Sequence, residues 1–286
     1  MVKGTARSTD RVTSRRSMGE RVSQCFQPHE AIPQQLSLAL KFTLFGILLI
    51  AWWLATTMDW IQPLFVPAPG SVLDTAVRLF TEEQLFADLG ISVYRVAIGF
   101  GLAALIGTPV GVLMGTFRVT RSLLEPVLAF IRYMPATAFI PLLILWMGVG
   151  DTQKFAVIFI GTFFHYTLLI MNVTVNIPLH YIESAHTLGA STRQIVTRVV
   201  WPASKPGIVD NLRIILGWAW TYIVVAEMVA ADNGIGYAIL RASRFLDTET
   251  IFVGILSIGL VGIASDYAFH RLSHWLFPYI KRERET

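Results

Sequence analysis

Charged side chains inside long apolar stretches are the first candidates for functional residues in this chain. Arg132, Arg213 and Glu227 each lie within a run of apolar residues. Because charge is costly in a membrane interior, such residues usually face a helix bundle or a substrate pathway. Arg132 and Arg213 could thus attract an anion. The alternative is structural: both lie near the end of their stretch, where snorkelling or pairing satisfies them, and Asp210 stands three residues from Arg213.

A histidine pair raises the possibility of metal chemistry. His270 and His274 are spaced as i and i+4, as in helical metal motifs. This spacing invites comparison with membrane-bound di-iron hydroxylases, which need several histidine clusters. The chain has six histidines in all, and this is its one close pair of that type, so contact with lipid headgroups is the better interpretation. Neither GxSxG nor HExxH occurs, so we expect no catalytic residues and no metal.

The composition places these residues in a membrane protein. Hydrophobic residues make up 54% of the chain and charged residues 15%, whereas soluble domains carry about 25% charge. The net charge of +4 is modest, and the basic residues lie between apolar runs rather than on a soluble face, which argues against nucleic-acid binding. Cys25 is the single cysteine, which excludes an intramolecular disulfide. A cleavable signal peptide is not expected, because a polar stretch precedes the first apolar run.

The apolar runs predict the topology. A bilayer core needs ~20 apolar residues in a helix, and about six segments qualify: 38–58, 92–117, 123–147, 155–175, 208–231 and 251–269. With the N-terminus inside, cytoplasmic segments hold fourteen Lys and Arg residues and external segments four, so both termini are expected in the cytoplasm. We therefore expect an all-α integral membrane protein with a transmembrane domain over 38–276, a basic N-terminal arm over 1–37 and a basic tail over 277–286.

Two connections are longer than turns. In the external connection 59–91, a Pro-Gly cluster predicts an amphipathic helix from Ser71. Its apolar face would be formed by Val72, Ala76, Leu79 and Phe80.

The cytoplasmic connection 176–207 has the more informative pattern. It contains IESAHTLGASTRQIVTRVVWPASKP. One short helix should stop at Gly189, which can adopt the left-handed cap conformation. Ser191 should begin a second helix, with Gln194 completing a capping box, and Pro202 and Pro206 should end it. Such a helix-turn-helix is too apolar to hang free in water, so we expect it to dock on a partner.

This connection resembles the EAA motif of permeases from bacterial ATP-binding-cassette importers. Glu183, Ala185, Gly189 and Pro202 fall at the spacings of that motif. Ser184, Val199 and Trp201 depart from it but keep its small or apolar character. The resemblance implies a coupling helix seated on an ATPase subunit through Glu183, Ser184, Ala185, Gly189, Ala190, Val199 and Pro202.

Further stretches are similar to one branch of these permeases, which serves nitrate, sulfonates, taurine or bicarbonate. They are VPAPGSV, LEPVLAFIRYMPATAFIPLLILWMGVG, GWAWTYIVVAEM and NGIGYAI, and with the loop they cover roughly residues 65–245. The resemblance implies a type I permease in a bacterial inner membrane, as a homodimer with two ATPase subunits. A solute-binding protein would dock on the external connections 59–91 and 232–250. A small anion is the favoured substrate, although related permeases also serve neutral or cationic nitrogen compounds.

The residues themselves support a division of labour. The sequence contains neither Gly-Lys-Ser nor Gly-Lys-Thr, so it lacks a Walker-type phosphate loop. We therefore expect a transport subunit with no cofactor of its own, whose ATP is bound by a partner. Two alternatives stay open: a secondary transporter, which often shows inverted repeats, and a membrane-bound metal-dependent hydroxylase.

Small residues form a stripe along the second predicted span. They recur every four residues, which lets helices approach closely in lipid. The stripe could be a dimer or sliding contact, but ordinary packing within one subunit is the favoured interpretation. Its members are Gly99, Ala103, Gly107, Gly111 and Gly115.

Overall fold

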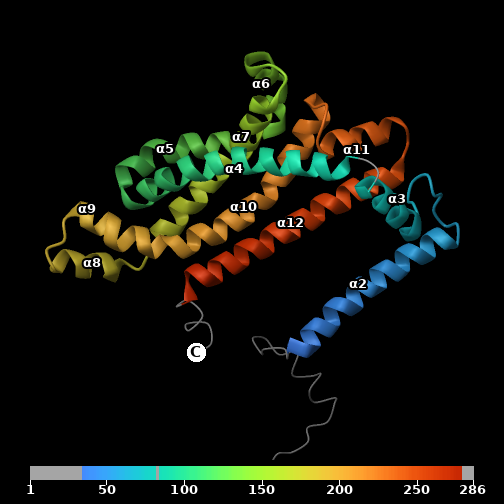
Figure 1. Ribbon diagram of the computed structural model, residues 1–286. Coiled ribbons are helices and arrows are strands. Elements are labelled where there is room, and N and C mark those ends of the chain that lie inside the picture. The colour runs from blue at the N-terminus through green and yellow to red at the C-terminus, as the bar shows by residue number, and fades with distance from the viewer. Residues whose placement is uncertain (1–33, 82–83, 279–286) are drawn as a thin grey trace, which may run out of the picture. The chain divides into compact units, whose positions relative to one another are not determined.

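The computed structural model describes residues 34–81 and 84–278 of the chain. These residues form helices joined by short connections, with no strand among them (Figure 1). Most of the N-terminal arm and of the C-terminal tail, including Cys25, lies outside the described residues. The chain divides into two units, residues 1–60 and 61–286, which are described in turn.

The first unit contributes one apolar helix, α2 (Gln34–Thr57). Its large side chains are exposed on every side, with Phe42 71% and Phe45 67% exposed. A helix that is apolar all round suits lipid rather than water. Residues 38–57 are long and apolar enough to cross a membrane, as predicted for 38–58.

Three long helices form the centre of the second unit: α4 (Leu85–Thr116), α7 (Asp151–Val175) and α10 (Trp201–Ala230). α4 and α7 run side by side in the same direction, because Gly99 lies against Ile158 and Gly115 lies against Thr174. α10 packs on both. Their shared core includes Phe100, Tyr166, Ile215 and Trp220.

The span predicted at 123–147 is broken into two helices. α5 (Arg118–Ile131) and the segment formed by a 3-10 turn (Ala136–Phe139) and α6 (Ile140–Met147) meet at a bend of 80°. Pro135 is extended at the break and Pro141 lies in the first turn of α6, where a missing N–H costs nothing. Among the described residues, five helices could cross a membrane, or up to six if this pair counts as one span. The count agrees with the expected six.

The connection over residues 176–207 continues directly into a span. α8 (Leu179–Thr187) is followed by α9 (Thr192–Ile195), a π-helical turn (Val196–Val200) and α10, which together form one helical run over residues 192–230. The prediction that Pro202 and Pro206 end the second helix is therefore wrong. Pro202 occupies the start of α10 directly after the wide π turn, which makes room for its ring, and Pro206 removes one helical hydrogen bond without breaking the helix.

Shorter helices lie around the other end of the unit. α3 (Pro69–Thr81) is the expected amphipathic helix and buries Val72 and Leu79. Phe80 was assigned to the same face, but it is exposed. Thr75 is buried in its place, because its position lies three residues after Val72 and four before Leu79. Its hydroxyl donates to Glu249 at 2.7 Å.

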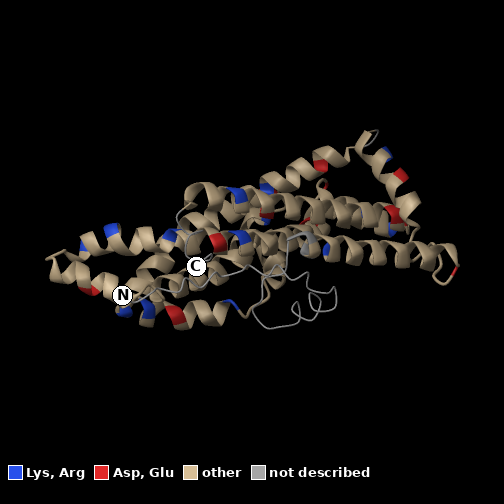
Figure 2. Ribbon diagram, turned by 90° about the horizontal axis from the view of Figure 1, so that it is seen from below, with Lys and Arg blue, Asp and Glu red and all other residues tan. Residues whose placement is uncertain are grey.

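The remaining helices are α11 (Ile235–Arg244) and α12 (Thr248–Leu276). Figure 1 shows α8 and α9 at one end of the second unit and α3 and α11 at the opposite end. Figure 2 shows long stretches of ribbon between these ends without charged residues. This arrangement separates the two connections as the predicted topology requires.

Candidate functional site

The turn between α8 and α9 has a defined backbone geometry. Gly189 adopts φ +77°, in the left-handed region. The N–H of Gly189 donates to the carbonyl of His186 at 2.9 Å, and the N–H of Ala190 donates to the carbonyl of Ala185 at 3.0 Å. These two bonds form a Schellman motif, which satisfies the last carbonyls of α8. The local sequence thus fixes where the first helix stops.

The second helix starts with the capping box that the sequence predicts. Ser191 accepts a hydrogen bond from the backbone N–H of Gln194 at 3.4 Å, and the backbone N–H of Ser191 donates to the Gln194 side chain at 2.8 Å. Both helix ends at this turn are therefore closed by short-range bonds. We call residues 183–202 the coupling turn, after the role that the resemblance to the EAA motif implies for them.

One side of the coupling turn packs on its own chain and the other is free. Ala185 and Ala190 pack against the central core, and Ile195 is buried. Glu183, Ser184, Gly189 and Pro202 are exposed, and Val199 is half-buried. Leu188, at the tip, is 86% exposed. The turn is thus held in place by one face, while its tip, with Leu188 exposed beside the polar His186 and Thr187, projects from the bundle.

A buried cluster of charged residues lies at the other end of α10. The guanidinium of Arg95, on α4, is 3% exposed and holds three elements at once. Its Nε donates to Asp151 of α7 at 2.7 Å, and its Nη1 donates to Glu227 of α10 at 2.8 Å. It also donates to the backbone carbonyl of Asn233 at 3.0 Å and to the Asn233 side chain at 2.5 Å.

Glu227 is fully buried, and both of its carboxylate oxygens accept hydrogen bonds from neighbouring residues. Besides Arg95, the hydroxyl of Ser92 donates to its two oxygens at 2.8 and 2.9 Å, and the N–H of Gly236 donates at 2.9 Å. Gly234 and Gly236 let the chain after α10 pass close by: a Cβ on Gly234 would lie 2.5 Å from a Glu227 oxygen. We call Ser92, Arg95, Asp151, Glu227 and Asn233 the external cluster, because the topology predicted from the sequence places this end of α10 outside.

Arg95 is the functional candidate that the sequence analysis missed. It lies inside the predicted span 92–117, so the signal was the same as for Arg132, namely an ionisable residue within an apolar stretch. Its partners are 56 to 138 residues away in the chain, and no local pattern announces them. The sequence predicts Glu227 as a candidate, and its ion pair with Arg95 explains how a carboxylate can be buried there.

The three candidate pathway residues have different surroundings. Arg213 pairs with Asp266 of α12 at 2.7 Å, and no Asp210 ion pair is found within the described segments, because the carboxylate on the neighbouring helix is better placed. Arg132 lies at the break between α5 and α6, with its guanidinium 4.9 Å from the centre of the Tyr133 ring. Its Nε is buried without a hydrogen-bond partner in the described part of the chain.

The small-residue stripe of α4 faces α7 of the same chain. A Cβ on Gly99 would lie 2.8 Å from Ile158, and one on Gly107 would lie 2.8 Å from Tyr166. Ala103, between them, is buried, and Gly111 and Gly115 are equally close to α7. The stripe is therefore where two parallel helices meet within one subunit.

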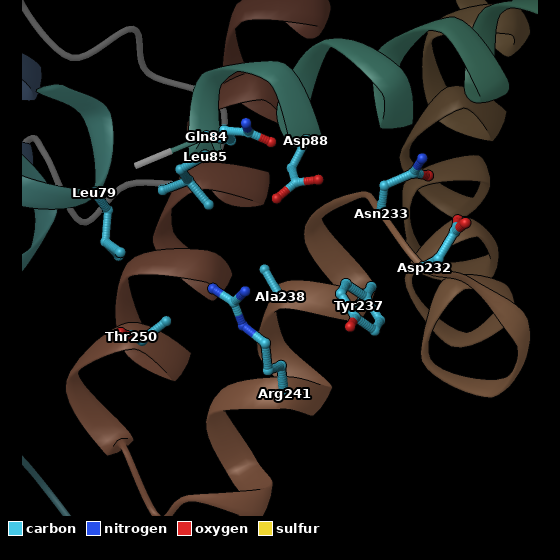
Figure 3. A pocket seen from close by; sticks show the side chains of 10 residues that line it. All are labelled: Leu79, Gln84, Leu85, Asp88, Asp232, Asn233, Tyr237, Ala238, Arg241 and Thr250. Atoms are coloured by element: carbon cyan, nitrogen blue, oxygen red, sulfur yellow. The ribbon is translucent and has the colours of Figure 1, made fainter. Parts of the chain in front are cut away.

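A polar pocket of about 310 Å³ opens beside the external cluster. It is lined by α3, α4, α11, the residues that join α10 to α11, and Thr250 of α12. Figure 3 shows Asp88 of α4 and Arg241 of α11 reaching into it from opposite sides. Asp88 also accepts the backbone N–H of Gly234 at 2.7 Å. The pocket thus contains a carboxylate and a guanidinium group next to the residues that follow α10, which are bound to the external cluster.

The two histidines of the last helix contact each other. Their Nε2 atoms lie 3.0 Å apart. Across residues 34–81 and 84–278, no group of three His, Cys, Asp or Glu residues could hold a metal ion.

Comparison with known proteins agrees with this geometry. The family described as binding-protein-dependent transport system inner membrane component matches residues 107–281. A probable ABC transporter permease of Brucella melitensis is 37% identical, over 83% of this chain and 97% of its own length. The taurine transport system permease protein of Escherichia coli is 31% identical, over 86% and 92%. The fold also matches an inward-facing structure of the MetNI methionine ABC transporter with a TM-score of 0.60 and 21% identity, over 66% of this chain and 94% of that one.

Proposed function

Because the chain belongs to the family of binding-protein-dependent transport system inner membrane components, it is the permease subunit of an ATP-binding-cassette importer, and we propose that it carries a small sulfonate. It is a transport subunit rather than an enzyme, and such permeases work with an ATPase and a substrate-binding partner. The relative named for taurine transport supports the sulfonate class. The substrate would then carry a negatively charged sulfonate group, which taurine combines with an ammonium group.

The proposed assembly is a homodimer in the lipid bilayer with both termini in the cytoplasm. The excess of Lys and Arg in the segments assigned to the inside supports this orientation. The coupling turn then faces the ATPase, and α3 and α11 face the binding protein at the opposite end of the unit (Figure 1). ATP is bound by the partner, and this chain needs no cofactor.

The coupling turn is the observation that carries the proposal. Its backbone is fixed by the Schellman motif and the capping box, while the tip residue Leu188 is 86% exposed. A projection with a fixed backbone and an exposed leucine at its tip fits a groove on another protein. When the ATPase subunits close on ATP, they would displace this turn, and the continuous helical run into α10 would carry the displacement into the membrane.

Reconstitution tests the proposed function directly. The permease should co-purify with an ATPase subunit, and proteoliposomes that contain both should take up labelled taurine when ATP is inside and the binding protein is outside. Uptake without ATP or without the ATPase would contradict the importer assignment. Uptake of nitrate or bicarbonate in place of taurine would contradict the sulfonate assignment alone.

Arg132 is the residue that we assign to the substrate pathway. It lies where the α5–α6 span breaks, and irregular backbone at membrane depth occurs where it lines a cavity or is buried in protein. Its Nε has an unused donor within the described residues, which a sulfonate oxygen could accept. Arg132→Gln should therefore lower the uptake rate on the order of tenfold, the value of one charge-assisted hydrogen bond.

The matched control is Arg121→Gln on the same helix, where the arginine forms an exposed ion pair with Glu125. It should leave uptake close to wild type. Both variants must first be shown to assemble with the ATPase. Normal uptake kinetics in an assembled Arg132→Gln transporter would remove Arg132 from the pathway.

A further inference from the structure

In the external cluster, two effects disfavour the negative charge of Glu227. Glu227 is fully buried, and it lies in the last turn of α10, where the helix dipole disfavours an anion. Burying an ion pair adds little to stability compared with a well-packed apolar pair, although removing one partner alone is strongly destabilising. The cluster therefore calls for an explanation other than fold stability.

The guanidinium of Arg95 is the one group of the cluster that reaches α4, α7, α10 and the chain beyond α10. It binds Asp151 at the start of α7, Glu227 near the end of α10, and both the backbone and the side chain of Asn233. Glu227 in turn accepts the N–H of Gly236. The position of α11, which follows Gly234 directly, is thus tied to α10 through these bonds.

The same helix joins this cluster to the coupling turn. Residues 192–230 form one helical run of 39 residues, with Ser191 capping its first residue and Glu227 in its last turn. A displacement of α11 would therefore reach the coupling turn through the ion pair of Arg95 with Glu227 and through the helical run that contains α10. The pocket between α3, α4 and α11 adds polar groups at the external end where a partner could bind.

We propose that Arg95 and Glu227 are positioning residues that transmit docking of the binding protein from α11 to α10 and so to the ATPase. This inference rests on the proposed function, because it requires a binding protein outside and an ATPase inside. Neither residue needs to touch the substrate. Their role is to keep α11 and the external end of α10 moving as one body.

The test compares ATPase rates of the reconstituted permease–ATPase complex with and without the binding protein, in the presence of taurine. The main variant is Arg95→Met with Glu227→Gln, which removes both charges together and leaves an oxygen at residue 227 for Ser92 and Gly236. It should assemble and melt near the wild-type temperature, because two opposite charges leave together and the buried Lys154 nearby keeps its hydrogen bond to the carbonyl of Gly150 at 3.1 Å. The ratio of the two rates should fall about fivefold or more, as for other allosteric couplings.

Arg121→Met with Glu125→Gln is the matched control. It makes the same two changes in an exposed ion pair of 2.8 Å within α5, and the ratio should stay at the wild-type value. Glu227→Gln alone is a second test, because Arg95 keeps the carboxylate of Asp151 and the complex should fold. Its ratio should also fall.

The outcomes separate the two proposals. A wild-type complex whose ATPase does not respond to the binding protein would contradict the proposed function, and the inference with it. If the wild type responds and both the double variant and Glu227→Gln respond equally, the inference alone is wrong. Equal losses of both rates, which a structural defect would cause, leave the ratio unchanged and likewise count against it.

Discussion

Gly189→Val is expected to abolish most ATP-driven uptake while the permease still inserts in the membrane. Gly189 has φ +77°, a conformation that costs an L-residue about 1–2 kcal/mol and is worst for a β-branched one. Because every 1.4 kcal/mol is about a factor of ten, the native turn should become about tenfold less populated relative to alternatives. ATP hydrolysis should continue without matching uptake, and the ratio of taurine imported to ATP hydrolysed measures this.

Two controls separate the turn from backbone strain in general. Gly148, at the other end of the unit, has a similar φ of +79° and also has open space around a Cβ. With ψ 177° Gly148 lies in a region that is essentially restricted to glycine, so Gly148→Val carries a local penalty at least as large as that at Gly189. It lies away from the coupling turn and should keep its ratio of uptake to hydrolysis. Gly189→Asn should be largely tolerated, because asparagine accepts the left-handed region. Coupled transport by Gly189→Val would remove the turn from the mechanism.

Gly111→Leu is expected to prevent the two central helices from packing. A Cβ at this position would lie 2.7 Å from the Cβ of Ile170 and 2.7 Å from the backbone oxygen of Thr167. Overpacking costs roughly 1–3 kcal/mol even where side chains can move, and here a backbone atom blocks the way. The loss should therefore be about 3 kcal/mol or more, seen as a lower melting temperature and a low yield of folded protein in detergent.

The same helix supplies the control for this prediction. Gly101 also lies on α4, but nothing lies within 4 Å of its Cβ position, so it faces away from α7. Gly101→Leu should be neutral or slightly stabilising, because leucine is favoured over glycine in a helix by about 0.8 kcal/mol. Equal destabilisation by both substitutions would mean that the contact between α4 and α7 is not what the stripe serves.

Features set by neighbouring residues were predictable from the sequence. The apolar runs gave about six spans because lipid forces every crossing segment to satisfy its own backbone. The stop at Gly189 and the capping box at Ser191 depend on residues within five positions of each other. The resemblance to the family motif led to the coupling role that we propose for this geometry.

Features set by contacts across the chain were not predictable. The partner of Arg213 is Asp266 rather than Asp210, which is nearer in the sequence. The neighbouring helix α12 provides the better-placed carboxylate. Arg95 went unnoticed since its partners come from α7, α10 and the residues after α10. The prediction that Pro202 and Pro206 end the helix is wrong for a different reason. The π turn before Pro202 lets the helix continue, and the composition gives no sign of that turn.

The uninterrupted helix over residues 192–230 has a mechanical consequence. At 1.5 Å per residue its 39 residues span roughly 58 Å, about twice the hydrocarbon thickness of a bilayer. A rod of that length acts as a lever arm: pivoting by about 5° at one end sweeps the other end through about 5 Å, close to one helical pitch. Small adjustments at either surface are thereby amplified at the opposite one, with no need for the helix to bend.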